Sequence, residues 1–248
     1  MVRTGLVSAT FKSQNASYVI ESARFAGLEA IEWSENHHIP AGDLAFAREV
    51  ARQTTDAGLK AAGYGSYFRL GQGMDIRTSL DTAAAMGIGQ VRIWAGTKAS
   101  ADVSEDERAK LTEELSKVCH IASGYGMVLN LEWHKNTLTD TNESGLAVLR
   151  AVGSPNLRTL WQPTQALSFE QRAQGLAMIS PYLSYMHVYY WDQSGRRPLS
   201  EGKEHWKRYL SLLDPRKDCY ALLEFVMGDS QEQFFDDART LKEIVSHG

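Results

Sequence analysis

The sequence has few of the residues that build cross-linked or membrane-embedded folds. Its 248 residues include only two cysteines and six prolines. Two cysteines are too few for a disulfide framework, so we expect Cys119 and Cys219 to be reduced structural thiols and the chain to be cytoplasmic. No apolar stretch is long enough to span a bilayer, and the first five residues lack the apolar run of a signal peptide. We therefore expect no membrane partner.

The sequence also lacks a strong excess of charge of either sign. Its 26 basic and 30 acidic residues give a net charge of −4, and both kinds are spread along the chain. Nucleic-acid binders usually show a basic stripe, so we expect no nucleic-acid partner. The 43% of hydrophobic residues allows a large core. Since single α/β barrels often run to about 250 residues, we expect one domain over residues 1–248.

Glycines occur at regular intervals. Five times a helical pattern stops at a glycine and a short apolar strand follows. A glycine just past a helix takes the left-handed conformation that closes the last turn. The spacing is about 30 residues, which is typical of one βαβ repeat. The five glycines are Gly27, Gly58, Gly87, Gly126 and Gly153.

Eight strand–helix units alternate without interruption. Helix starts are marked by capping sequences such as Ser104-x-x-Glu107 and Ser168-x-x-Gln171. Unbroken alternation predicts a parallel sheet, and eight units over this length favour an α/β fold of the closed (β/α)8 TIM barrel type. A doubly wound open sheet is the alternative, but no Gly-x-Gly-x-x-Gly turn follows an early strand. The predicted strands are residues 4–10, 30–33, 59–64, 90–95, 127–133, 157–162, 183–189 and 220–225.

Polar residues stand late in four of the predicted strands. They are Glu132, Gln162, His187 and Glu224. Active groups of such barrels lie at the carboxyl ends of the strands, and side chains alternate along a strand, so these four can face one pocket. Glu32 and Arg92 also fall near strand ends.

Each of these residues alone also has a structural interpretation. A single glutamate can form an ion pair, His187 can be a satisfied core histidine, and Arg92 can pair with Glu32 or Glu132. As a set, however, they would be costly to bury without a common partner, and a divalent cation is the simplest one. The oxygen-rich donors with one nitrogen and no thiolate favour Mn²⁺, Mg²⁺ or Co²⁺, while Zn²⁺ stays open.

The sequence resembles the xylose isomerase-like barrels of the sugar phosphate isomerase/epimerase superfamily over essentially its whole length. The residues that carry the resemblance are Ile31-Glu32-Trp33 with His38, Tyr64-Gly65-Ser66-Tyr67, Arg92-Ile93-Trp94-Ala95-Gly96, Asn130-Leu131-Glu132, His187-Val188 and Leu223-Glu224-Phe225.

This resemblance implies a metal site. Members of the ketose-epimerase type hold one divalent metal ion by glutamate, aspartate, histidine and glutamate on strands five to eight. Glu132, His187 and Glu224 match, but Gln162 replaces the aspartate and Gln165 replaces a histidine that often follows. With one carboxylate fewer, we expect weaker metal retention and a more strongly polarising ion. The expected substrate-binding residues are Glu32, His38, Tyr64, Arg92, Trp94, His134, Gln165 and Arg197.

The same residues imply proton-transfer chemistry. A metal ion on a carbonyl and its neighbouring hydroxyl acidifies the C–H between them, and Glu132 and Glu224 can remove and return the proton. We expect an isomerase or epimerase acting on a small carbohydrate or polyol, phosphorylated or not, with a dehydratase or other lyase second. A non-catalytic sugar-binding barrel is the alternative from another class. The resemblance also admits a homo-oligomer.

Overall fold

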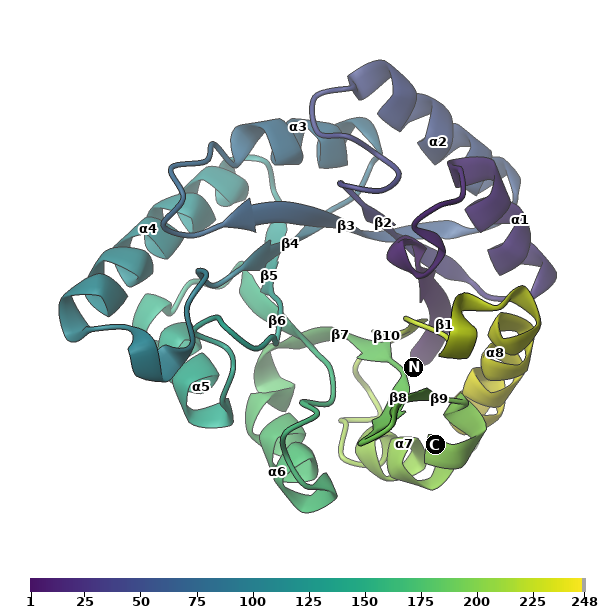
Figure 1. Ribbon diagram of the computed structural model, residues 1–248. Coiled ribbons are helices and arrows are strands. Elements are labelled where there is room, and N and C mark those ends of the chain that lie inside the picture. Colours follow the sequence, from purple (N-terminus) through teal and green to yellow (C-terminus); the bar gives the residue numbers. More distant parts are fainter. Residues whose placement is uncertain (247–248) are drawn as a thin grey trace.

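Eight parallel strands close into a ring in the computed structural model, which describes residues 1–246 (Figure 1). The ring closes where β1 pairs with β10, in a register that runs from Val2 opposite Cys219 to Leu6 opposite Leu223. This confirms the predicted (β/α)8 barrel. The strands are β1 (Val2–Val7), β2 (Ala30–Ser34), β3 (Lys60–Arg69), β4 (Gln90–Trp94), β5 (Val128–Leu131), β6 (Leu157–Trp161), β7 (Leu183–Val188) and β10 (Cys219–Leu223).

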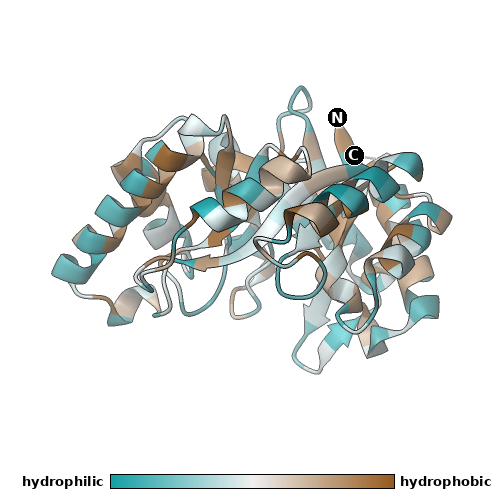
Figure 2. Cartoon of the chain, turned by 90° about the horizontal axis from the view of Figure 1, so that it is seen from above, coloured by the Kyte–Doolittle hydropathy of each residue, from teal (hydrophilic) through white to brown (hydrophobic). Residues whose placement is uncertain are grey.

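The helices surround this ring (Figure 1), and those at the front of Figure 2 carry both hydrophilic and hydrophobic residues along their length. The last helix lies beside the first, where Lys242 Nζ donates to the carbonyl of Ala26 at 2.6 Å. No helix within residues 1–246 is long and apolar enough to cross a membrane. The helices are α1 (Ala16–Phe25), α2 (Leu44–Asp56), α3 (Arg77–Ala85), α4 (Glu105–Gly124), α5 (Asn142–Val152), α6 (Phe169–Ile179), α7 (Lys203–Leu210) and α8 (Gln231–Ser246).

The predicted helix ends are largely confirmed. All five glycines have positive φ, and Gly153 (φ 58°) closes α5 with its N–H donating to Leu149 O at 3.0 Å. Ser168 forms the complete predicted capping box with Gln171. The box predicted at Ser104 forms by half, because the Glu107 carboxylate accepts from Lys98 at 2.7 Å instead.

Several strand ends differ from the prediction, and the differences shape the pocket. Residues 8–11 form a 3-10 turn rather than the end of β1. β3 continues to Arg69 with a shift of register after Gly65. An unpredicted hairpin follows β7, formed by β8 (Tyr190–Asp192) and β9 (Gly195–Arg197). β5, β6 and β10 stop one residue before Glu132, Gln162 and Glu224 respectively.

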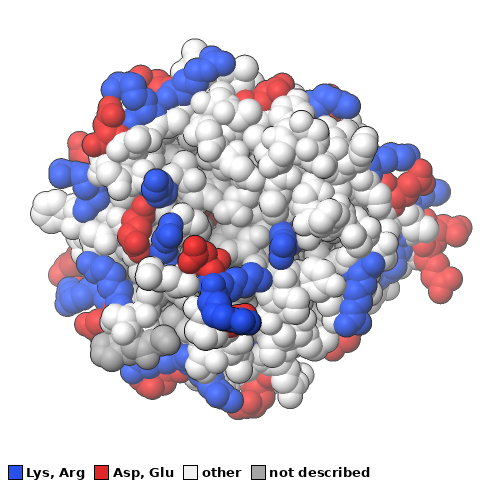
Figure 3. Space-filling view, turned by 180° about the vertical axis from the view of Figure 1, so that it is seen from behind, with Lys and Arg blue, Asp and Glu red and all other residues white. Residues whose placement is uncertain are grey.

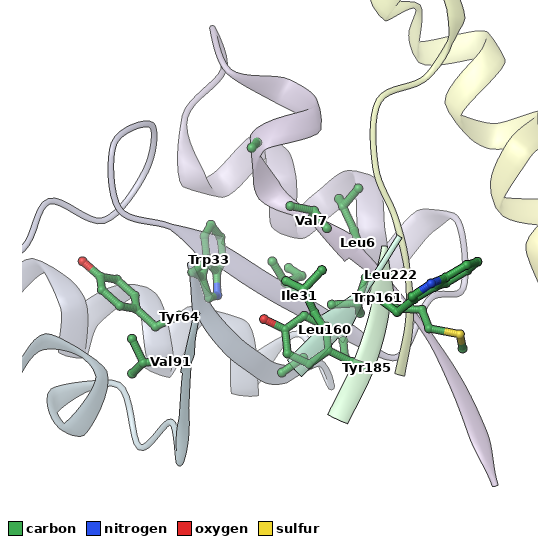
Figure 4. Close-up of a cluster of buried hydrophobic side chains, with 14 of the residues drawn as sticks. Leu6, Val7, Ile31, Trp33, Tyr64, Val91, Leu160, Trp161, Tyr185 and Leu222 are labelled. Atoms are coloured by element: carbon green, nitrogen blue, oxygen red, sulfur yellow. The ribbon is translucent and has the colours of Figure 1, made fainter. Parts of the chain in front are cut away.

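Successive side chains along a strand point alternately outward, toward the helices, and inward, so an apolar layer outside the barrel is separated from a more polar interior. Leu131 and Trp161 belong to the buried hydrophobic core, whereas the neighbouring Glu132 and Gln162 belong to the pocket. Lower in the barrel, Asn130 Nδ2 donates to Gln90 Oε1 at 3.2 Å. Figure 4 shows part of the apolar core, with labelled side chains from β1, β2, β3, β4, β6, β7 and β10. Burial of these side chains holds the strand ends in a fixed arrangement.

Candidate active site

A pocket of about 570 Å³ opens at the carboxyl ends of the strands. Polar side chains from five elements reach it, and aromatic side chains such as Tyr67, Trp94 and Trp191 form its walls. A concave site with a few convergent polar groups is typical of small-molecule sites. The polar residues at its base are Glu32, Arg92, Glu132, Gln162 and Glu224.

Five buried side chains form a continuous line of alternating charge under this pocket. Arg92 Nη1 donates to Glu132 Oε2 at 2.6 Å, and Arg92 Nε lies 3.9 Å from Glu32 Oε1. His187 Nε2 lies 2.9 Å from Glu32 Oε2. His187 Nδ1 lies 3.3 Å from Glu224 Oε2. We call the set Glu132, Arg92, Glu32, His187 and Glu224 the floor chain.

Burial and neighbouring charge act in opposite directions on this chain. Burial would lower the pKa of His187, but the carboxylates of Glu224 and Glu32 outweigh burial and raise it to about 10. Burial would raise the pKa of Glu32, yet His187 and Arg92 hold it below its usual value. Glu132 and Glu32 likewise raise the pKa of Arg92 above its usual value, against the effect of burial. The floor chain therefore keeps its side chains charged although they are buried.

Gly65 makes room for this arrangement. A Cβ atom at Gly65 would lie 2.8 Å from Glu32 Oε1 and 2.9 Å from Arg92 Nη2. Both contacts are too short for real Cβ atoms, so any larger residue would push the ion pair apart. This close approach is the physical reason for a glycine inside β3.

Gln162 joins the floor chain at one end. Its Nε2 donates to Trp133 O at 2.8 Å and to Glu132 Oε1 at 3.4 Å. The amide oxygen makes no hydrogen bond to another described residue and is available to a ligand. Gln162 therefore replaces a third strand-end carboxylate with a neutral donor.

The donor chemistry fits a divalent cation. With His187 protonated, the state that its raised pKa favours, the floor chain sums to −1; with His187 neutral, as a metal ligand must be, it sums to −2, the charge that a divalent ion balances. His187 Nδ1 is buried without a hydrogen bond and faces Glu224. Glu132, however, is turned toward Arg92, and among residues 1–246 no three His, Cys, Asp or Glu side chains meet as a ready metal-ligand group. Of the four predicted ligands, the structure thus brings His187 and Glu224 together, while Gln162 contacts Glu132 and Glu132 is held by Arg92.

His134 stands at the side of the pocket with a defined orientation. Its Nδ1 lies 2.6 Å from the carbonyl of Lys135, an arrangement in which Nδ1 carries the proton. The ring packs edge-on against Trp94 at 4.5 Å. Nε2 then keeps a free lone pair, because it has no hydrogen bond to another described residue.

A family model described as a xylose isomerase-like TIM barrel matches residues 20–244. The chain belongs to this family. The resemblance inferred from the strand-end motifs is therefore confirmed, as is the predicted fold.

The proteins to which this xylose isomerase-like barrel is similar are themselves enzymes of two kinds. A 3-dehydroshikimate dehydratase of Bacillus anthracis is 26% identical over 168 residues, which are 63% of this chain and 60% of that relative. The solved structure of the probable 3-DHS dehydratase of the same organism has a TM-score of 0.82 at 20% identity, with 98% and 99% of the two chains covered. The solved structure of D-psicose 3-epimerase of Clostridium cellulolyticum H10 with D-tagatose has a TM-score of 0.75 at 14% sequence identity, with 98% of each chain covered. At these identities the structural matches support the fold alone.

The predicted substrate-binding residues of this xylose isomerase-like barrel fall into two groups. Those that line the pocket are Glu32, Arg92, Trp94, His134 and Gln165. The other three have protein partners. His38 Nε2 lies 3.2 Å from Phe11 O, and burial lowers the His38 pKa to about 4. Tyr64 donates to Ile39 O at 2.9 Å, and Arg197 donates to Glu201 at 2.9 Å. The structure does not bring these three to the pocket lining.

The pocket is also lined by residues that were not among the predicted site residues, and three of them are notable. Lys12 and Lys135 line the pocket, are exposed, and form no ion pair with another described residue. Phe225 also lines it, in the left-handed backbone region at φ 53°, which is unfavourable for an aromatic residue. All three follow a strand in sequence, so the rule that strand-end loops build the pocket could have found them.

Proposed function

We propose that this barrel is a dehydratase that removes water from a small hydroxylated carbonyl compound. The observation that carries the proposal is the floor chain, which holds two carboxylates, Glu132 and Glu224, at its two ends beneath the pocket. The dehydratase relative from Bacillus anthracis supports elimination over the isomerisation that the motifs alone ranked first.

The proposed reaction needs one proton to move between two positions of the substrate. A carboxylate takes the proton from the carbon next to the carbonyl, and the electron pair of that C–H bond forms the new C=C bond. The C–O bond to the β-hydroxyl breaks, and the hydroxyl leaves as water with the proton returned to it. Glu224 and Glu132 are the proposed carriers, and the free Nε2 of His134 is a third acceptor at the pocket wall.

The proposed cofactor is one divalent cation. His187 Nδ1, a Glu224 oxygen and the Gln162 amide oxygen would hold it, with Glu132 contributing once it turns from Arg92. Mn²⁺, Mg²⁺ and Co²⁺ suit these donors best. When bound, such an ion supplies positive charge that stabilises the negative oxygen of the substrate carbonyl.

A ketose 3-epimerase is the second candidate. It would use the same two glutamates, one on each face of the substrate carbon, to remove a proton and return another. The feature that favours it is the position of Glu132 and Glu224 at opposite ends of the floor chain.

The test is an NMR screen in D₂O with Mn²⁺ at a concentration that leaves lines readable, using 3-dehydroshikimate, D-tagatose and related keto-polyols. A dehydratase gives new vinyl or aromatic protons and a rise in ultraviolet absorbance. An epimerase gives deuterium at the α-carbon and a new stereoisomer. A non-catalytic binder gives neither, and that result would remove both proposals.

A further inference from the structure

Glu32 occupies an unusual place in this fold, since it contacts both cations of the floor chain and is 1% exposed. Its Oε2 lies 2.9 Å from His187 Nε2, and its Oε1 faces Arg92 Nε at 3.9 Å. Both oxygens are thus directed to protein groups.

The neighbouring strand lets Glu32 make these two contacts. β3 lies between β2 and β4, with Gly63 opposite Glu32 and Gly65 opposite the next inward-facing residue, Ser34. Without side chains at these positions, Glu32 reaches past β3 to Arg92 on β4. A Cβ atom at Gly65 would lie 2.8 Å from Oε1 and close this route.

The consequence reaches the two glutamates of the proposed reaction. A histidine that donates one ring N–H to a carboxylate presents its other nitrogen in a fixed direction. Here that nitrogen is Nδ1 of His187, which faces Glu224 at 3.3 Å. On the other side, Arg92 holds Glu132 at 2.6 Å.

We infer that Glu32 is a positioning residue that orients His187 and Arg92 together and so sets the separation of Glu132 and Glu224. It does not act as the substrate ligand that its strand-end position suggests. This inference rests on the proposed function only where metal binding is measured, because Glu32 contacts His187 and Arg92 through protein groups alone.

The experiment compares Glu32→Gln with a matched control, Glu35→Gln. Glu35 is three residues away, accepts from Ser79 Oγ at 2.8 Å and does not line the pocket. Long-range ¹H–¹⁵N spectra of the imidazoles in metal-free protein report the His187 Nε2–H bond. Titration with Mn²⁺, followed by calorimetry, reports the metal site.

We expect Glu32→Gln to shift or abolish the protected His187 Nε2–H signal and to weaken Mn²⁺ binding by about 10- to 100-fold, the usual cost of losing such a partner. Glu35→Gln should change neither. Unchanged His187 spectra in folded Glu32→Gln would overturn the inference. If wild-type protein binds no Mn²⁺, the proposed metal site fails, and the spectra alone decide the role of Glu32.

A second variant covers the case in which Glu32→Gln does not fold. Gly65→Ala keeps every charge and crowds Glu32 and Arg92 from the β3 side. We expect it to shift the same His187 signal. An unshifted signal in folded Gly65→Ala contradicts the inference as well.

Discussion

The two ends of the barrel use the same charged residue types in opposite ways. At the amino ends of the strands, Asp218 pairs with the Met1 ammonium at 3.2 Å and with Arg3 at 3.8 Å, and the Met1 and Asp218 groups are 83% and 73% exposed. At the carboxyl ends, the floor chain is almost entirely buried. Exposed pairs contribute little to stability, whereas buried ones are costly unless every charge is matched. The comparison supports our proposal that the buried set serves the chemistry of the pocket rather than stability.

The surface agrees with this contrast. On the face seen from behind the view of Figure 1, acidic and basic side chains lie side by side, without a large area of one sign (Figure 3). Such mixed charge is the ordinary state of a protein surface in water. A buried line of paired charges beneath a pocket is unusual by comparison.

The largest expected effect comes from one end of the floor chain. Glu224→Gln keeps the size of the side chain but removes its ability to take a proton. We expect dehydration activity to fall by about 10²- to 10⁴-fold, the usual share of a general base. Steady-state kinetics checks this, with Glu35→Gln as the control. Retention of most activity would remove Glu224 from the proposed reaction.

The next effect is on stability. Arg92→Met leaves Glu132 buried without its cation and leaves Glu32 with His187 alone, and removing one partner of a buried pair costs about 3–5 kcal/mol. Arg3→Met at the opposite end should cost less than about 1 kcal/mol. Urea unfolding of both variants measures the difference. Equal costs would mean that the two ends do not differ in the way proposed here.

Stability should also depend on pH through His187. Its pKa of about 10 in the folded chain exceeds the usual 6.5, so the stabilisation is complete below pH 6.5 and is lost as pH rises through about 10. We expect the unfolding temperature of metal-free protein to fall over this range, and to fall less in His187→Gln. Thermal unfolding followed by circular dichroism in chelator tests this. If the unfolding temperatures of wild type and His187→Gln changed with pH in the same way, this prediction would be contradicted.

A smaller effect is expected at Gln162. Gln162→Asp adds one carboxylate beside Glu132, and calcium-type oxygen sites tighten with the number of charged ligands. We expect Mn²⁺ to bind about tenfold more tightly, as read by calorimetry. Unchanged affinity would show that the amide is not at the metal.

The smallest effect should come from Asp218→Asn at the amino ends of the strands. Asp218 is 73% exposed, and its partners Met1 and Arg3 are 83% and 41% exposed, so the free energy of unfolding should change by less than about 1 kcal/mol and activity should not change. Urea unfolding and the kinetic assay measure this. A clear loss of activity would couple the two ends of the barrel.

Much of the fold could be predicted from sequence because its signals are local. Glycine stops, caps such as Ser168 and apolar strands depend on a few consecutive residues. The hairpin after β7 was missed because its strands are three residues long and lie outside the barrel.

The sequence predicted where the site residues lie, but not which side chains pair with one another. Strand-end parity brought Glu132, Gln162 and Glu224 to the pocket, since it follows from chain geometry. That Arg92 would take Glu132 while Glu32 takes His187 depends on side-chain packing across four strands and on the empty space at Gly65. Sequence patterns carry no signal for such choices.

The difference between the floor chain and the residues at the pocket mouth has an evolutionary consequence. Each member of the floor chain touches another, so a single exchange there disturbs several neighbours. At the mouth, Lys12 and Lys135 form no ion pair with another described residue, and Lys12 Nζ lies 5.1 Å from the centre of the Phe225 ring. The Gln165 side chain makes no hydrogen bond to another described residue, although its carbonyl accepts from Arg172. Single substitutions at the pocket mouth could therefore change substrate preference during evolution while the floor chain stays unchanged.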